Sequence, residues 1–188
     1  FKRLVSASWG YDLLFDARRS PLWTWATRYT LKRSAAFVGD CATIRNLAVS
    51  YGMNPARIVT FPWGVDIRQF QPGSDNGLRQ RLGWDESHFV LLSTRSWAPL
   101  YGVEDLARAF VQAADQAPEL RLLLLGSGPQ AELLKSIFRE HDLLERVRFP
   151  GQVAQADLPD YYVLADLYIS TSHSDGTSIS LLEALASG

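Results

Sequence analysis

The chain has 188 residues, of which 47% are hydrophobic and 21% are charged, as in ordinary soluble globular proteins. Its formal net charge of -1 argues against a general nucleic-acid binder, because no surplus of basic side chains is present to neutralise phosphates. The single cysteine, Cys41, cannot form an internal disulfide, and no apolar run has the length of a membrane span. We therefore expect a cytoplasmic protein.

The first part of the chain alternates strand and helix patterns. Strands are predicted at residues 4–8, 36–39 and 57–61, with a turn at 9–12 and a helix at 21–35. A second helix follows Asp40, which stands at an N-cap position, and ends at Gly52. This strand-helix-strand order with short turns predicts parallel strand pairing.

The helix predicted at 21–35 is rich in aromatic residues. Trp23, Trp25 and Tyr29 precede Lys32 and Arg33, a mixture that also occurs in helices lying on membranes. The hydrophobic face is short and the cationic one sparse. We therefore expect these aromatic side chains to pack against a sheet.

A polar segment at 67–77 has the composition of a linker and predicts a domain boundary, with one domain at 1–75 and a second at 76–188. Beyond it, strands are predicted at 89–94, 120–125, 147–149 and 167–170. Helices are predicted at 103–114, 130–140, 155–165 and from 179 onward. Apolar strands separated by amphipathic helices predict an α/β fold with a doubly wound parallel sheet.

Ligands of such sheets bind at the carboxyl ends of the strands. Four turns follow those ends, at 95–102, 126–129, 150–153 and 171–178. Arg95 comes directly after its strand and is suited to a two-pronged phosphate contact, although a surface arginine explains it equally well. Gly126 and Gly128 allow close approach of a ligand, but a tight strand-to-helix connection is the better explanation of that turn alone.

The last turn carries two acids. Asp175 and Glu183 bracket a strand-turn-helix junction, where unpaired backbone N–H groups favour anions. Asp175 is suited to sugar hydroxyls or to an Asx-turn. Glu183 is suited to a ligand or to a capping box with Ser180. His173 lies in the same turn and is kept as a weaker candidate contact.

The histidines and Cys41 show no metal-ligand spacing, and no catalytic Ser/His/Asp order, HExxH motif or Walker-type lysine is present. The residues therefore predict no metal site.

The segment from Asp175 to Glu183 resembles the Glu-x7-Glu motif of family 4 retaining glycosyltransferases with the GT-B fold. Five further stretches resemble segments of that family in the same order: 9–12, 61–66, 93–103, 125–129 and 149–153. The resemblance covers the end of an acceptor-side Rossmann-like domain and most of a donor-binding one.

The resemblance implies binding of a nucleotide-diphosphate sugar, such as a UDP-sugar, and transfer of the sugar with retention, and it leaves the nucleotide and the sugar open. It places Glu183 at the ribose, Asp175 at the sugar hydroxyls and Arg95 at the diphosphate. The other donor-binding residues that it implies are Gly126, Gly128, Gly151, Val153, Gly176, Thr177, Ser178 and Ile179. Trp9, Gly10 and Asp12 would lie on the acceptor side of the cleft.

Three positions depart from the family pattern. Tyr101 stands where the family usually has a lysine, which removes a second cation from the diphosphate. Asp175 replaces the first glutamate and is one methylene shorter. Trp9 stands where a histidine is common, so stacking would replace a polar contact.

We therefore expect a fragment of a metal-independent, cofactor-free glycosyltransferase that is inactive by itself. The acceptor would be a glycan, a lipid or a small molecule, with no nucleic-acid partner. Peripheral contact with the inner face of a membrane would go through the rest of the N-terminal domain. The alternatives are a nucleotide-sugar epimerase or hydrolase of the same fold, and a noncatalytic nucleotide-sugar-binding module.

Overall fold

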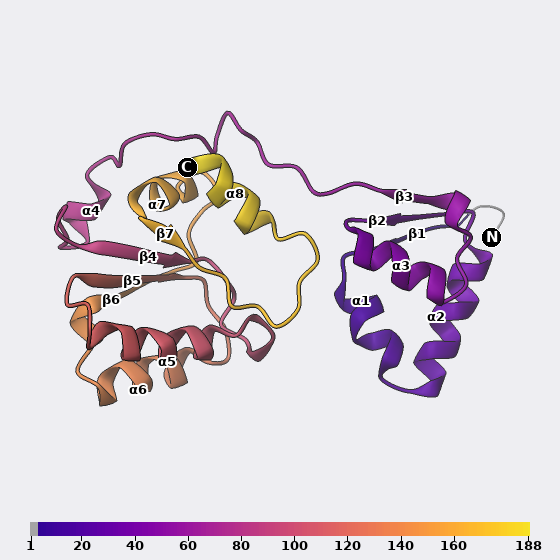
Figure 1. Cartoon of the computed structure of the whole chain (residues 1–188), viewed down its shortest axis with the longest axis horizontal. Coiled ribbons are helices and arrows are strands. Elements are labelled where there is room, and N and C mark those ends of the chain that lie inside the picture. Colours follow the sequence, from indigo (N-terminus) through magenta and orange to yellow (C-terminus); the bar gives the residue numbers. More distant parts are fainter. Residues whose placement is uncertain (1–3) are drawn as a thin grey trace. The chain divides into compact units, whose positions relative to one another are not determined.

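The computed structural model describes residues 4–188 and divides into two compact units (Figure 1). The first unit contains the chain up to Gly64 together with residues 174–178. The second contains Val65–His173 and Ile179–Gly188. The domain boundary predicted between residues 75 and 76 remains a prediction.

The first unit is built on a parallel sheet of order β1-β2-β3, formed by β1 (Val5–Ser8), β2 (Ala36–Gly39) and β3 (Ile58–Thr60). Its helices are α1 (Tyr11–Leu14), α2 (Pro21–Arg33) and α3 (Ala42–Ser50). Their apolar faces bury a core that includes Leu13, Leu31, Phe37, Ile44 and Ala48. The predicted parallel pairing is confirmed, and the predicted turn at 9–12 is shorter because α1 begins at Tyr11.

The aromatic residues of α2 do not pack as predicted. Trp23, Trp25 and Tyr29 are all exposed, Trp25 by 60%, and Leu31 is the residue of α2 that the core buries. Trp25 and Tyr29 stack on each other with ring centroids 5.3 Å apart, and the Arg33 guanidinium lies 4.4 Å from the Tyr29 ring. The prediction that these aromatics pack against the sheet is therefore wrong.

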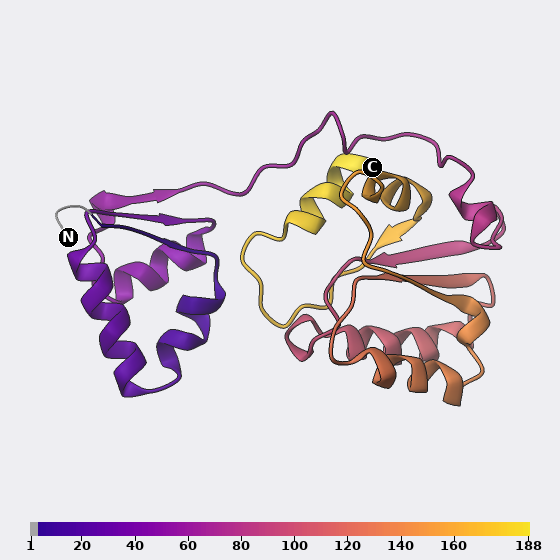
Figure 2. The same cartoon turned by 180° about the vertical axis from the view of Figure 1, so that it is seen from behind.

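The second unit contains a parallel sheet of order β6-β5-β4-β7, formed by β4 (Phe89–Ser93), β5 (Leu120–Leu125), β6 (Val147–Gly151) and β7 (Leu167–Tyr168). Helices α5 (Val103–Ala114) and α6 (Ala131–Glu140) cover one face. Helices α7 (Leu158–Leu164) and α8 (Ile179–Ser187) lie on the other, as Figures 1 and 2 show. A short helix, α4 (Leu78–Arg81), precedes β4.

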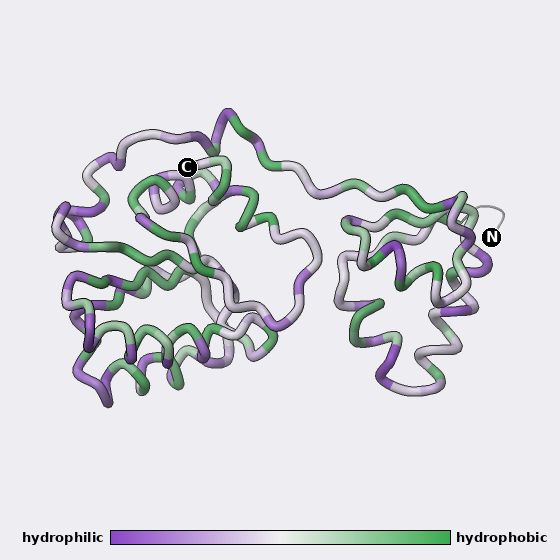
Figure 3. The backbone as a smooth tube through the Cα atoms, viewed as in Figure 1, coloured by the Kyte–Doolittle hydropathy of each residue, from purple (hydrophilic) through white to green (hydrophobic). Residues whose placement is uncertain are grey.

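Side chains of β5 explain the two helical layers. Leu122 and Leu124 belong to the core cluster under α5 and α6, whereas Leu123 and Leu125 belong to the cluster under α7. Successive residues of a strand point to opposite faces, so a strand that is apolar throughout is covered on both sides. Figure 3 shows this hydrophobic strand beside helices of alternating character. The predicted α/β fold with a doubly wound parallel sheet is confirmed.

One helix is shorter than predicted. α7 begins at Leu158 rather than at Gln155, with Asp157 as its N-cap residue and Pro159 in its first turn. Proline fits that turn because its missing N–H has no partner there in any case. Gln155 therefore lies in the turn before α7, from which its side chain can reach the carboxyl edge of the sheet.

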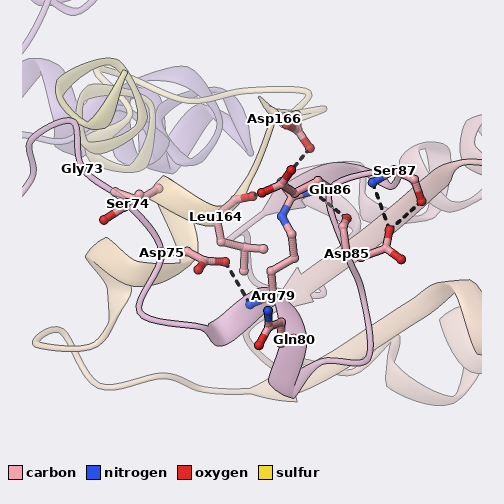
Figure 4. Close-up of a pocket in the computed structure, with 11 residues that line it drawn as sticks. Gly73, Ser74, Asp75, Arg79, Gln80, Asp85, Glu86, Ser87, Leu164 and Asp166 are labelled. Atoms are coloured by element: carbon pink, nitrogen blue, oxygen red, sulfur yellow. Dashed lines mark hydrogen bonds and ion pairs between the residues drawn. The ribbon is translucent and has the colours of Figure 1, made fainter.

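A pocket of about 740 Å³ lies beside the amino ends of β4 and β7 and is lined by α4, by the turn before β4 and by the end of α7 (Figure 4). Arg79 reaches across it from α4 and donates hydrogen bonds to the backbone oxygens of His88 and Leu164, both at 2.7 Å. Its guanidinium also pairs with Asp166 at 3.0 Å, and Asp166 accepts a bond from the Val90 amide. Arg79 therefore braces the edge opposite to the one that binds ligands in doubly wound sheets.

Arg79→Met is expected to lower the free energy of unfolding of the second unit by about 2–4 kcal/mol, because it leaves carbonyl groups and a carboxylate without their cationic donor. Denaturant unfolding measures this loss. Arg81→Met is the matched control, since the Arg81 side chain is exposed and donates to the Asn76 carbonyl rather than across the pocket. Equal stability of the two variants would contradict the bracing role.

Candidate functional site

Backbone contacts join the first two turns at the carboxyl edge of the second sheet. The Trp97 amide donates to the Ser127 oxygen, and the Gln130 amide donates to the Trp97 oxygen, both at 3.0 Å. A Cβ atom on Gly128 would collide with the Trp97 backbone. This close packing accounts for Gly128 without a ligand, and its assignment to donor binding remains a prediction.

The third turn joins the second through Gly126. The Gly126 amide donates to the Gly151 oxygen at 2.7 Å, and both glycines have positive φ, +106° and +81°. Such backbone conformations favour glycine. Among residues 4–188, no atom outside Gly151 and its two chain neighbours lies within 4 Å of a Cβ built on Gly151, so the space on that side is open. Val153, two residues later, is half-buried against the core cluster under α7.

The fourth turn is fastened to the first. The Thr171 hydroxyl donates to the Gly102 oxygen at 2.8 Å, and a Cβ on Gly102 would collide with the Thr171 backbone. The His173 amide donates to the Leu100 oxygen, and its ring Nε2 lies 3.2 Å from Asp105. These contacts explain the position of His173 without a ligand.

Arg95 lies at the amino-terminal turn of α8. Its Nη1 donates to the hydroxyl of Ser180, the second residue of that helix, at 3.1 Å. Its guanidinium lies 4.5 Å from the centroid of the Tyr101 ring. Tyr101, which stands where the family usually has a lysine, therefore supports Arg95 by a cation–π contact.

A chain of hydroxyl groups continues from Ser180 into the sheet. The Tyr168 hydroxyl donates to Ser180 at 2.8 Å, and the Thr94 hydroxyl hydrogen-bonds to the hydroxyl of Tyr162 at 3.2 Å. The Thr94 hydroxyl also hydrogen-bonds to that of Tyr168 at 3.4 Å, so these groups link the end of β4 to α7 and α8, and Tyr162 extends the chain to Glu183.

Glu183 is a buried carboxylate with two donors. Tyr162 donates to Oε2 at 2.9 Å and Gln155 donates to Oε1 at 3.1 Å, while the residue is only 6% exposed. α8 begins at Ile179, so Ser180 lies inside the helix and not at its cap. The capping-box explanation of Glu183 is therefore wrong. Each carboxylate oxygen still has capacity to accept a ligand hydroxyl.

Burial raises the pKa of Tyr162 far above its ordinary value of 10.0. The hydrogen bond with Thr94 opposes this shift, and the nearby Glu183 carboxylate adds to it. Tyr162 therefore keeps its proton at any physiological pH and remains the donor to Glu183.

The loop at 174–178 belongs to the first unit. Asp175 Oδ1 accepts a bond from the Gly176 amide at 2.9 Å. The Thr177 amide donates to Asp40 Oδ2 at 2.8 Å, and the Thr177 hydroxyl donates to the Asp40 backbone oxygen at 3.1 Å. The prediction that Asp40 caps α3 is wrong, because the N-cap residue is Cys41. Ser178 ends this loop.

The acceptor-side residues lie at the start of α1, also in the first unit. Trp9 is exposed and meets Trp63 edge-to-face with centroids 5.4 Å apart. Gly10 has a φ of +112°, and Asp12 accepts a hydrogen bond from Ser8 at 2.8 Å. No contact described in the structure tests their predicted role.

Sequence reasoning missed Asp40, Gln155 and Tyr162 as partners of the predicted site residues. Tyr162 and Gln155 both lie in the segment 155–165, whose pattern predicts one helix. Pro159 was the signal for a later helix start, because proline favours the first turn. Asp40 carried no signal beyond the helix cap, since its partner Thr177 lies 137 residues away.

Comparison with known proteins defines the class. The fold is of the GT-B type, with two α/β units that are each built on a parallel sheet, and with turns gathered at the carboxyl edge of the second sheet. The structure of Anabaena Alr3699/HepE in complex with UDP and glucose has a TM-score of 0.82 at 21% identity, covering 98% of this chain and 50% of that one. The sucrose-phosphate synthase of Thermosynechococcus elongatus has a TM-score of 0.77 over 96% of this chain and 47% of that one, also at 21% identity. The chain belongs to the glycosyl transferases group 1 family, whose model matches residues 75–188.

Curated relatives are similar over three quarters of the chain. The D-inositol 3-phosphate glycosyltransferase of Kineococcus radiotolerans is 34% identical over 153 residues, which is 76% of this chain and 35% of that protein. The mannosylfructose-phosphate synthase of Agrobacterium fabrum is 33% identical, with 76% of this chain and 33% of that protein covered. The chain thus matches about a third of the length of these relatives.

Two features are absent from residues 4–188. Within that range, no group of three or more His, Cys, Asp or Glu side chains is arranged to hold a metal ion. Across the same described part of the chain, no helix combines the length and hydrophobicity needed to cross a bilayer.

Tyr162→Phe is expected to cost about 1–3 kcal/mol of unfolding free energy, because a buried Glu183 oxygen loses its donor. Because the folded protein keeps the Tyr162 proton above the ordinary pKa of 10.0, the unfolded state releases that proton first and wild-type stability falls above about pH 10. The variant should lack this component of the fall. Denaturant titrations between neutral and alkaline pH measure both effects, and Tyr161→Phe, at a half-buried neighbour, is the control.

Proposed function

We propose that the whole protein transfers a sugar from a nucleotide-diphosphate sugar, with UDP as the nucleotide, to a hydroxyl acceptor with retention of configuration. The observation that carries this proposal is the bond between Arg95 and Ser180 at the amino terminus of α8. It sets a guanidinium beside the positive end of a helix, and both features favour an anion such as a diphosphate.

The chemistry of this proposal needs little from side chains beyond charge and position. The bond between the sugar anomeric carbon and the diphosphate oxygen breaks, and the acceptor oxygen forms its bond on the same face. The departing diphosphate takes the proton of the acceptor. Arg95 and the α8 terminus would stabilise the negative charge that develops on the leaving group. Because Tyr101 stands in place of a second cation, Arg95 would carry most of this task.

Glu183 is suited to the nucleotide ribose. A buried carboxylate that is already held by Tyr162 and Gln155 has its oxygens fixed in direction, and it can accept ribose hydroxyls without rearrangement. Asp175 would accept hydroxyls of the donor sugar. Amides of the turn at 176–179 would meet the diphosphate, and the open side of Gly151 would face the base.

The acceptor, metal independence and the inactivity of this chain alone are further parts of the proposal. Relatives are named for inositol phosphate, for mannosylfructose phosphate and for glucosyldiacylglycerol, which supports a polyol, sugar or lipid hydroxyl as acceptor. Family resemblance supports a reaction without metal or cofactor. Product analysis with and without acceptor separates this function from an epimerase or hydrolase. Tight donor binding without turnover would favour a noncatalytic module.

Glu183→Ala is expected to abolish detectable UDP-sugar binding by the full-length protein, a loss of at least about a hundredfold, because ribose hydroxyls lose a charged acceptor. Titration calorimetry with a panel of UDP-sugars and GDP-mannose measures it. The matched control is Glu140→Ala, an exposed acid on α6. Unchanged donor affinity in the Glu183 variant would leave that residue a purely structural buried acid.

The proposal includes peripheral membrane contact from the cytoplasmic side, and it places this contact on α2 rather than on the rest of the N-terminal domain, because the α2 aromatic residues are exposed. Leu22, Trp25 and Tyr29 are exposed and follow one another at spacings of three and four, so they form one stripe. Arg28 and Lys32 flank it, and α2 contains no acid. Trp and Tyr beside cations are suited to an anionic lipid surface.

Arg28→Glu/Lys32→Glu should reduce binding of the full-length protein to vesicles of equal parts phosphatidylglycerol and phosphatidylcholine by at least about tenfold, since each cation near an anionic surface contributes about 1 kcal/mol. Vesicle co-sedimentation measures it. Lys135→Glu/Arg139→Glu, on α6 with the same spacing, is the control. Equal binding by the two double variants would reject α2 as the lipid contact.

A further inference from the structure

Asp40 is a buried acid that no predicted role explains. It follows β2 directly and is only 4% exposed. Cys41, not Asp40, is the N-cap residue of α3. One oxygen of the Asp40 carboxylate, Oδ1, is buried without a hydrogen-bond partner among residues 4–188. Burying a carboxylate is costly, so its retention at this place calls for a specific partner.

That partner is the loop at 174–178. Asp40 Oδ2 accepts a bond from the Thr177 amide at 2.8 Å, and the Asp40 backbone oxygen accepts one from the Thr177 hydroxyl at 3.1 Å. The two hydrogen-bond donors of Thr177, its amide and its hydroxyl, are therefore directed at one residue. A hydrogen bond from an amide to a charged carboxylate is stronger than a hydrogen bond between two neutral groups.

Gly176 completes the contact. A Cβ atom built on Gly176 would collide with the Asp40 carboxylate, so with any larger residue there the carboxylate or the loop has to shift. The φ of Gly176 lies outside the left-handed region, so the requirement comes from Asp40 and not from the backbone. On its other side, a Cβ on Gly10 would lie 3.5 Å from the Gly176 amide nitrogen.

We propose that Asp40 is a positioning residue for donor binding. Asp40 holds the 174–178 loop in its binding conformation before the donor arrives. This inference rests on the proposed function, because it takes this loop as part of the donor site. Each residue of a free loop costs about 1–2 kcal/mol to order, so an anchored loop spares the donor that cost. Asp40 acts through Thr177 and Gly176 and needs no contact with the sugar.

Asp40→Ala is expected to raise the Kd for UDP-sugar in the full-length protein about tenfold, as loss of one charge-assisted bond would do. Asp40→Asn keeps an oxygen for the Thr177 amide and should stay within about threefold of wild type. The KM for donor should rise with the Kd while kcat changes less. Unchanged donor affinity in Asp40→Ala would overturn the proposal. Tighter binding would overturn it too, because Asp40 would then be a competitor for the Thr177 amide.

A double-mutant cycle tests the contact itself. Gly176→Ala should weaken donor binding in the wild-type background, because the methyl group displaces the Asp40 carboxylate. In the Asp40→Ala background the space is free, and the same substitution should have little further effect. Gly73→Ala is the control, since a Cβ there meets only a Val163 methyl at 3.9 Å. Additive effects of the two substitutions would overturn the proposal.

Hydrogen exchange separates this inference from the proposed function. In the wild-type protein without donor, the Thr177 amide should be protected, and Asp40→Ala should remove that protection while α3 and β2 keep theirs. If no UDP-sugar binds to the wild-type protein, the proposed function fails and this exchange result still decides whether Asp40 holds the loop. An unprotected Thr177 amide in the wild-type protein would overturn the inference.

Discussion

A buried carboxylate has to be met by hydrogen-bond donors, and the carboxyl edge of the second sheet is arranged around this requirement at Glu183. Tyr162 reaches it from α7 and Gln155 from the turn before that helix. The hydroxyl of Tyr162 is tied in turn to Thr94 at the end of β4. The Glu183 carboxylate is thereby held by hydrogen bonds that lead to both β4 and α7, so the fold sets the direction of its oxygens.

Glycines set how closely the surrounding turns approach. Gly128 lies against the Trp97 backbone and Gly102 against the Thr171 backbone, while Gly126 donates to Gly151. At Gly102, Gly126 and Gly128 a side chain would meet backbone atoms, which do not move aside as flexible side chains do. The turns that are predicted to surround the donor are thus held by main-chain packing, and ligand contacts are added to a surface that exists without them.

Much of this architecture was predictable from the sequence. The second unit was predictable as a doubly wound sheet, because the local periodicity of apolar residues identifies both its strands and its amphipathic helices. The exposure of the α2 aromatic residues was not predictable, because periodicity shows that a helix face is apolar but not whether another element covers it. The bonds of Glu183 and Asp40 join residues 21 to 137 positions apart. Spacing along a chain carries no information on such pairs, and the capping box at Ser180 was a local pattern that the tertiary contacts overrode.

The fastening of the turns also bears on how such a protein diversifies. Turns that touch through main chain tolerate neither added residues nor larger side chains at the contact, so their lengths are constrained together. Variation at this edge is left to the exposed side chains of the turns, such as Ser96 and Gln152. A lineage built on this frame would change its ligand preference by exchanging side chains on a constant backbone. Insertions and deletions would gather in the segments that the glycine contacts leave unconstrained.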